Sequence, residues 1–156
     1  MRVVLDAGAL IGIDRRDRTI GAMLRILQRD GVPVRTSAGA VAQVWRNGRT
    51  QAGLALVLRG MEVAPLDEPV AKNVGELLRT NKTSDLVDAH VALLVDGGDI
   101  VITSDETDIQ ALLRSRRVKA IIVRASLPGS SGKTHPPPTA TISTRKQGAV
   151  PASKLS

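Results

Sequence analysis

Apolar runs of strand length alternate with amphipathic segments along most of the chain. Such runs occur at residues 2–5, 32–36, 62–64, 100–103 and 119–123. Between them, apolar residues recur with helical spacing at 19–29, 38–46, 51–58, 69–79, 85–95 and 107–114. Strands separated by helices pair in parallel, and helices then cover both faces of the sheet. The pattern predicts an α/β fold of three layers, with a parallel central sheet flanked by helices.

The pattern stops near residue 125, where the composition changes. Residues 126–156 contain 18 Ser, Thr, Pro and Gly among 31 residues, with four Lys or Arg and no acid. Residues 1–125 hold 18 Lys or Arg and 15 Asp or Glu, so they contribute +3 of the net charge of +7. A segment so poor in apolar residues cannot offset the entropy of ordering it. We expect a globular domain over 1–125 and a disordered basic tail over 126–156.

The composition excludes several classes of site. The chain has no Cys, so it has no disulfide framework, zinc–cysteine site or thiol nucleophile. No stretch approaches the roughly 20 apolar residues of a membrane span, and the N-terminal apolar run is interrupted by Asp6, unlike a signal peptide. We expect a soluble cytoplasmic protein that does not bind membranes. Trp45 is the one aromatic residue, which argues against base stacking and leaves the phosphate backbone as the contact for a nucleic acid.

Acidic residues follow two of the predicted strands. Asp6 comes directly after the first strand, and Asp105 follows the fourth. Asp85 and Asp88 are spaced i, i+3 at the start of a predicted helix, and Asp108 lies three residues after Asp105. Each acid alone is explained as a complement to a helix N-terminus. Ligands of open parallel sheets bind beyond the carboxyl ends of the strands, however, and crowded carboxylates stay ionised around a hard divalent cation. The joint pattern therefore favours Mg²⁺ or Mn²⁺.

Four segments resemble a known family. VVLDAGAL at 3–10, AVAQVWRNGR at 40–49, SDLVDAHVALL at 84–94 and VITSDETD at 101–108 are similar to the PIN-domain ribonucleases, most of all to VapC-type toxins of bacterial toxin–antitoxin pairs. The resemblance covers roughly residues 1–124. It implies a PIN-like three-layer fold and a Mg²⁺-dependent endoribonuclease that leaves 5′-phosphate and 3′-hydroxyl ends. It also implies RNA as substrate, a cognate antitoxin as partner, and a homodimer.

The resemblance assigns the acids. Asp6, Asp88 and Asp105 fall on the family's catalytic metal ligands, while Asp85 and Asp108 lie where additional acids often occur. These residues would hold the ion, which lowers the pKa of a bound water and offsets charge in the phosphoryl transition state.

One position departs from the family pattern. Gln43 stands where the family usually has a glutamate ligand, so the number of metal ions is open, and Asp85 is a candidate for the missing charge. Arg46 and Arg49 are candidates for gripping flanking phosphates, and Thr103 for binding a phosphate or orienting Asp105.

Other residues are expected to be structural. His90 lies two residues beyond Asp88, so it points away from it and is expected to pack, and Trp45 is expected to belong to the core.

Other functions remain as alternatives. Gln43 is also compatible with a catalytically weak or inactive PIN domain that binds RNA or a protein. A phosphoryl-transfer domain with an aspartyl nucleophile would need a second acid at position 8, which is Gly8. A receiver domain would need a lysine after a late strand, whereas Lys119 begins one.

Overall fold

The computed structural model describes residues 1–83 and 85–125, so the predicted tail lies outside the described residues. Five strands form one sheet in the order β3-β2-β1-β4-β5, and every neighbouring pair is parallel. The strands are β1 (Val3–Leu5), β2 (Val34–Ser37), β3 (Glu62–Ala64), β4 (Ile100–Thr103) and β5 (Ile121–Arg124). The predicted α/β fold with a parallel central sheet is confirmed.

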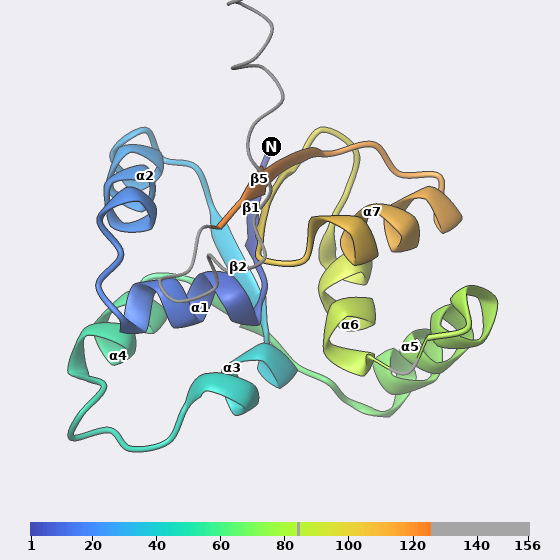
Figure 1. Cartoon of the computed structure of the whole chain (residues 1–156), viewed down its shortest axis with the longest axis horizontal. Coiled ribbons are helices and arrows are strands. Elements are labelled where there is room, and N and C mark those ends of the chain that lie inside the picture. The colour runs from blue at the N-terminus through green and yellow to red at the C-terminus, as the bar shows by residue number, and fades with distance from the viewer. Residues whose placement is uncertain (84, 126–156) are drawn as a thin grey trace, which may run out of the picture.

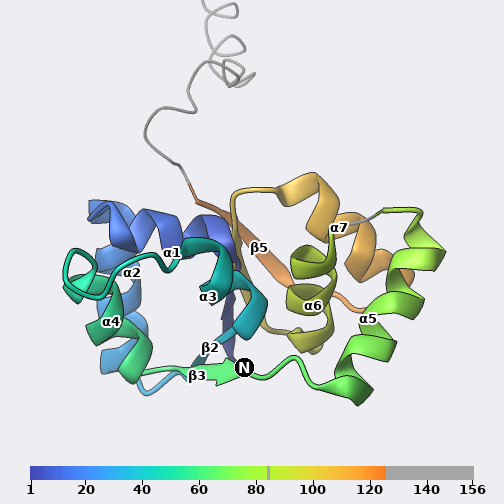
Figure 2. The ribbon, with the colours of Figure 1, turned by 90° about the horizontal axis from the view of Figure 1, so that it is seen from below.

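Helices cover both faces of this sheet (Figure 1). They are α1 (Ala7–Asp14), α2 (Arg18–Arg29), α3 (Ala38–Val44), α4 (Ala52–Arg59), α5 (Glu68–Asn81), α6 (Leu86–Leu94) and α7 (Glu106–Ser115). Figure 2 shows α1, α2 and α4 on one side of the strands and α5, α6 and α7 on the other, which gives the three layers. No helix among the described residues has the length and apolar character needed to cross a membrane.

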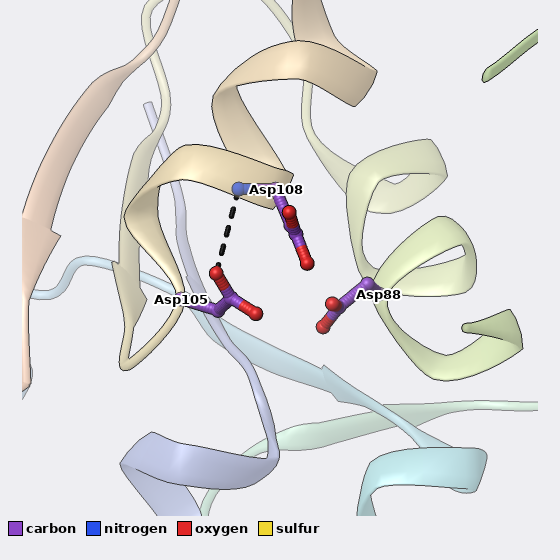
Figure 3. A group of neighbouring side chains, drawn as sticks. All are labelled: Asp88, Asp105 and Asp108. Carbon is purple, nitrogen blue, oxygen red and sulfur yellow. Dashed lines mark hydrogen bonds between the residues drawn. The ribbon is translucent and has the colours of Figure 1, made fainter. Parts of the chain in front are cut away.

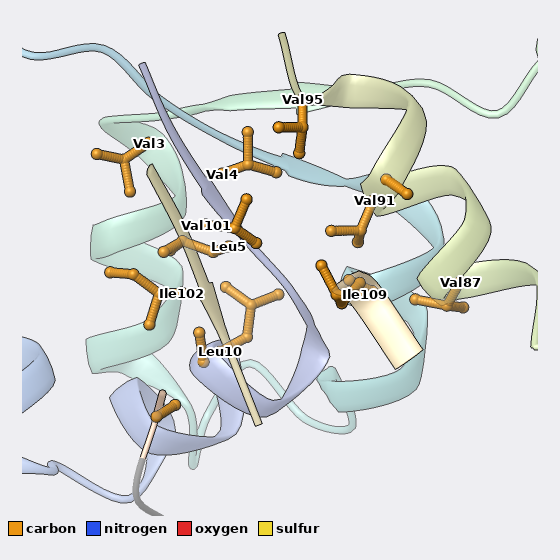
Figure 4. Packing of buried hydrophobic residues seen from close by; sticks show 14 of the residues in the cluster. Val3, Val4, Leu5, Leu10, Val87, Val91, Val95, Val101, Ile102 and Ile109 are labelled. Carbon is orange, nitrogen blue, oxygen red and sulfur yellow. The ribbon is translucent and has the colours of Figure 1, made fainter. Parts of the chain in front are cut away.

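The central strands are apolar because both of their faces are covered. Val3, Val4 and Leu5 of β1 are fully buried, as are Val101 and Ile102 of β4. Figure 4 shows these side chains packed between the helical layers. Parallel strands buried on both faces read as continuous apolar runs, which is why the sequence marked them clearly.

Helix α1 was not predicted, although it follows β1 directly. Its buried residues are Gly8, Ala9, Leu10 and Gly12. A helix that is apolar on most sides has no amphipathic period to detect. Its start is marked by Asp6, whose Oδ1 accepts the Ala9 N–H at 2.8 Å as an N-cap.

The predicted helix over 38–46 ends earlier, at Val44, because the next segment is held elsewhere. Trp45 adopts an extended conformation. The Gln51 side-chain oxygen then accepts the N–H groups of Arg46, at 2.6 Å, and Asn47, at 2.9 Å. The last strand also starts two residues later than predicted, at Ile121. Arg46 therefore lies in the loop after α3 rather than on the helix, and Arg49 lies in the same loop.

The strand order reverses between β1 and β4. From β1 the chain moves outward to β2 and β3, whereas β4 leads to β5 on the opposite side. The two strands are in register, with Leu5 opposite Ile102. Such a switch point leaves a crevice beyond the carboxyl ends of the strands, where ligands of open α/β sheets bind. Asp6 and Asp105 follow the strands that border it.

Gly8 tests the contact between α1 and the end of β4. A methyl group at Gly8 would overlap Cβ and Oγ of Ser104, so Gly8→Ala is expected to destabilise the fold by roughly 1–3 kcal/mol. Gly75, in the middle of α5, has open space around it, so Gly75→Ala is expected to stabilise the protein by about 0.5–1 kcal/mol. Urea unfolding of both variants measures the difference. Equal effects would contradict the close contact.

Candidate metal centre

Three carboxylates converge at the crevice (Figure 3). Asp88 lies in the first turn of α6, Asp105 caps α7, and Asp108 lies in the first turn of α7. One carboxylate oxygen from each lies within 4.8 Å of the others. We call these residues the acidic cluster. It brings together two of the three ligands assigned by the family resemblance, with Asp108 as the third member.

Besides Asp6, two more of the acids at the crevice cap helices, as the simpler interpretation of the sequence proposed. Asp85 Oδ1 accepts the Asp88 N–H at 3.0 Å, and Asp105 Oδ1 accepts the Asp108 N–H at 3.4 Å. Capping and cation binding are compatible here, because a carboxylate oxygen has further lone pairs. The partial positive charge at the N-termini of α6 and α7 also offsets part of the repulsion among the acids.

Asp6 lies outside the acidic cluster. It is 2% exposed, and its Oδ2 accepts the Thr103 hydroxyl at 2.5 Å and the Ser104 N–H at 3.1 Å. Burial raises the pKa of the Asp6 carboxyl, whereas its hydrogen bonds to Thr103, Ala9, Ser104 and Gly8 lower it. The structure thus places Asp6 as the buried acid that joins β1, α1 and β4.

Thr103 links Asp6 to the cluster. Its hydroxyl is buried, donates to Asp6, and accepts the Asp105 N–H at 2.8 Å. These bonds fit the orienting role considered for Thr103, since a hydroxyl used in this way is not free for a phosphate. The contact to Asp6 spans 97 residues, so the sequence alone did not reveal it.

The electrostatics of Asp88 are the most unusual feature of the site. Burial, first, and the nearby charges of Asp85, Asp105, Asp6 and Asp108 together raise the pKa of Asp88 to about 7. Among the described residues, no hydrogen bond reaches the Asp88 carboxylate. Its ionised form is therefore unfavourable until a positive charge arrives.

Asp105 shows the same behaviour with a different neighbour. Its pKa is raised by burial and by the hydrogen bond and charge of Asp108. Two adjacent acids that ionise reluctantly are the donors that a divalent cation stabilises in their charged form.

The spacing of the oxygens suits a small hard cation. Mg²⁺ binds oxygen at 2.0–2.1 Å in octahedral geometry, so opposite ligands lie about 4.2 Å apart. Three ligands cannot all be opposite one another, and neighbouring ligands lie only about 3 Å apart, so the oxygens of the acidic cluster, which lie within 4.8 Å of one another, would need side-chain movements of roughly 1 Å to close on the ion. The residues present therefore fit the metal that the sequence predicts.

Gln43 and Asp85 lie to one side of the cluster. Both are exposed and line a cavity of about 590 Å³ with Gly39, Leu86 and Val87. Gln43 thus lines the same surface hollow as Asp85, the acid that was considered for the missing charge.

The predicted phosphate contacts lie in the loop after α3. Arg46 is exposed, and its Nη1 donates to the carbonyl groups of Ala42 and Trp45, at 3.2 Å and 2.7 Å. Arg49 is exposed as well, and its backbone N–H donates to the Asn47 side chain. The structure does not bring either arginine into the acidic cluster.

The two residues expected to pack, His90 and Trp45, are buried or partly buried. His90 is fully buried, and its Nδ1 lies 2.6 Å from Ser37 Oγ. Trp45 is partly buried and packs against the core.

A solved structure has this fold. A chain from the crystal structure of VapBC2 from Rickettsia felis, bound to a DNA fragment from their promoter, superposes with a TM-score of 0.56 at 14% sequence identity. The match covers 81% of this chain and 100% of that chain. This chain shares its fold with a VapBC2 chain. No family model and no curated protein matches the sequence.

The raised pKa of Asp88 predicts an unusual pH dependence in the metal-free protein. The folded state holds the proton up to about pH 7, whereas the unfolded chain releases it near 3.8. Below pH 3.8 the Asp88 carboxyl is protonated in both states and does not lower the free energy of unfolding. As pH rises from 3.8 toward 7, its burial lowers the free energy of unfolding progressively. In EDTA, Asp88→Asn should raise Tm increasingly over that range. Glu76→Gln, an exposed control on α5, should not. A Tm difference of equal size at low and neutral pH would contradict the shift.

Proposed function

We propose that the protein is a Mg²⁺- or Mn²⁺-dependent endoribonuclease and the toxin of a toxin–antitoxin pair. The acidic cluster at the switch point of the sheet is the observation that carries the proposal. It unites acids from two segments of the resemblance, residues 84–94 and 101–108. The likeness to a VapBC2 chain supports the toxin assignment through the fold.

The residues of the site have distinct roles in this proposal. Asp88, Asp105 and Asp108 would hold the cation, which supplies a nucleophile by lowering the pKa of a bound water and offsets charge on the phosphoryl oxygens. Thr103 orients the backbone of Asp105 and bonds to Asp6. Asp6, which the family resemblance assigns as a metal ligand, acts on Asp88 through its charge; its oxygens accept protein hydrogen bonds and keep lone pairs for a cation, so it is a further candidate ligand that also holds Thr103 and Ser104 in place.

RNA would be held through its phosphates. Arg46 and Arg49 offer exposed guanidinium groups in the loop after α3, and the arginine fork matches phosphate geometry. Trp45 packs against the core and is not free to stack with a base. Contacts to the backbone position a nucleic acid without reading its sequence, so specificity would come from the shape of the surface.

This proposal includes two protein partners, the antitoxin and a second copy of the chain, and one groove on the surface suits such a partner. A groove of about 610 Å³ runs between α2 and α4. Its lining combines the apolar side chains Ile13, Leu24 and Val57 with Arg16, Arg18 and Arg25. Apolar contact area with a cationic rim suits a partner segment that carries apolar and acidic side chains.

Cleavage of RNA by metal-loaded protein tests the activity. Asp88→Asn removes a cluster ligand and no hydrogen bond of its side chain, so it should lower Mg²⁺-dependent cleavage roughly 100-fold or more while the fold is kept. A pool of synthetic RNA, sequenced at both new ends, should yield 5′-phosphate and 3′-hydroxyl termini. Asp6→Asn should also abolish cleavage, but it places an amide N–H₂ against the Ser104 N–H and so also lowers Tm.

The outcome separates the two candidate functions. An RNA- or protein-binding module would hold RNA in EDTA and leave it intact with Mg²⁺. Full cleavage by the Asp88→Asn variant would refute the acidic cluster as the active centre.

Gln43 offers a second test of the metal site. Gln43→Glu adds a carboxylate beside Asp85, so the dissociation constant for Mg²⁺ should fall roughly five-fold, the effect of about 1 kcal/mol of Coulomb attraction. Tm in EDTA should fall as well, because another acid joins the crowded crevice. Calorimetric titration measures the first and thermal melts the second. Gln28→Glu on α2 is the matched control, and identical behaviour of the two variants would place Gln43 outside the metal's reach.

A further inference from the structure

A second cavity lies on the α5–α6 side of the sheet, away from the acidic cluster. It has a volume of about 390 Å³ and is lined by Arg35 of β2, Val70 of α5 and Leu93 of α6, among others. Asp88 lies in the first turn of α6, whereas Leu93 lies near its end. This α5–α6 cavity opens beside the exposed residue Asn73, and a water takes only about 30 Å³ of liquid volume, so there is room for a small organic molecule.

Two buried polar atoms on its lining residues lack partners. Arg35 Nε and His90 Nε2 have no hydrogen-bond partner among the described residues. His90 is 0% exposed, and 16% of the Arg35 side chain is exposed. Buried polar groups are nearly always paired, so two such atoms from residues that line one cavity indicate a missing ligand atom.

Both atoms are donors. The guanidinium group of Arg35 has donors only. For His90, the hydrogen bonds of Ser37 determine which ring nitrogen carries the proton. Ser37 Oγ accepts the N–H groups of Gly39, at 2.9 Å, and Ala40, at 3.3 Å. Its own proton is then left for His90 Nδ1, at 2.6 Å, so the ring carries its proton on Nε2. The ligand must therefore supply an acceptor.

Among the described residues, one arginine that lines the cavity, Arg116, has no acidic partner and can balance a single negative charge. Arg35 already shares its charge with Glu62, at 3.0 Å. Arg116 also lines the cavity, and its Nη1 donates to two carbonyl groups at the end of α6, but it pairs with no acid among the described residues. Asp67 acts on His90 from the start of α5 and would repel a second negative charge.

We propose that the α5–α6 cavity binds a small aliphatic monocarboxylate. Its carboxylate accepts hydrogen bonds from Arg35 Nε and His90 Nε2, and its chain packs against Val70 and Leu93. The charge balance disfavours a phosphate dianion, and the apolar wall disfavours a ligand that is polar throughout. This site is independent of the proposed nuclease activity.

Titration of the full chain with hexanoate in EDTA tests the proposal. The protein has two histidines, so ¹⁵N-histidine labelling resolves His90 and reports its tautomer. Hexanoate should shift the His90 Nε2–H signal saturably, whereas 1-hexanol should bind roughly ten-fold more weakly, because it offers no anionic acceptor. Equal binding of the alcohol, tighter binding of inorganic phosphate, or a proton on Nδ1 would overturn the proposal.

Variants separate the site from general charge effects. Arg35→Met should weaken hexanoate binding roughly ten-fold or more, while Arg59→Met on the exposed end of α4 should not change it. Val70→Phe fills the cavity and keeps both donors, so it should abolish the shift even where Arg35→Met fails to fold. Unchanged binding by Val70→Phe would refute the site.

Discussion

The buried carboxylate of Asp6 is the constraint on which the architecture of the site depends. It follows β1, caps α1 through the Ala9 N–H, and accepts two hydrogen bonds from the end of β4. A charge at 2% exposure is costly to bury, so these hydrogen bonds are required to keep it there. They bring residues 97 positions apart in the chain together, and so hold the ends of the two central strands at one crevice.

That crevice then gathers more negative charge than the fold alone can balance. Asp88 has a pKa of about 7 because it is buried among other acids, and Asp105 is affected by Asp108 in the same way. The N-termini of α6 and α7 offset part of the repulsion. The repulsion that remains among the acids lowers the free energy of unfolding of the metal-free protein at neutral pH. In the proposed metal site, stability of the metal-free protein and affinity for a cation would therefore oppose each other, a trade-off that is common at functional sites.

The sequence predicted the parts of the structure that depend on local pattern. Strands buried on both faces leave continuous apolar runs and amphipathic helices such as α2 leave a clear helical period, and the acids after β1 and β4 lie at one edge of a parallel sheet. Helix α1 left no period because it is apolar on most sides. The early end of α3 depends on Gln51, and the role of Thr103 on a contact across 97 residues. The hydrogen bond between Ser37 and His90 likewise joins residues 53 positions apart, so no local pattern in the sequence predicts it.

The two ends of α6 lie near the two proposed sites, and its dipole affects both. Its N-terminus carries partial positive charge and faces the acidic cluster, where Asp85 caps it. Its C-terminal carbonyl groups carry partial negative charge, and Arg116 binds two of them, at 2.6 and 2.8 Å. A cation at that end stabilises the helix and also places positive charge beside the α5–α6 cavity. The same dipole therefore favours the acids of the proposed metal site at one end and the arginine beside the proposed carboxylate site at the other.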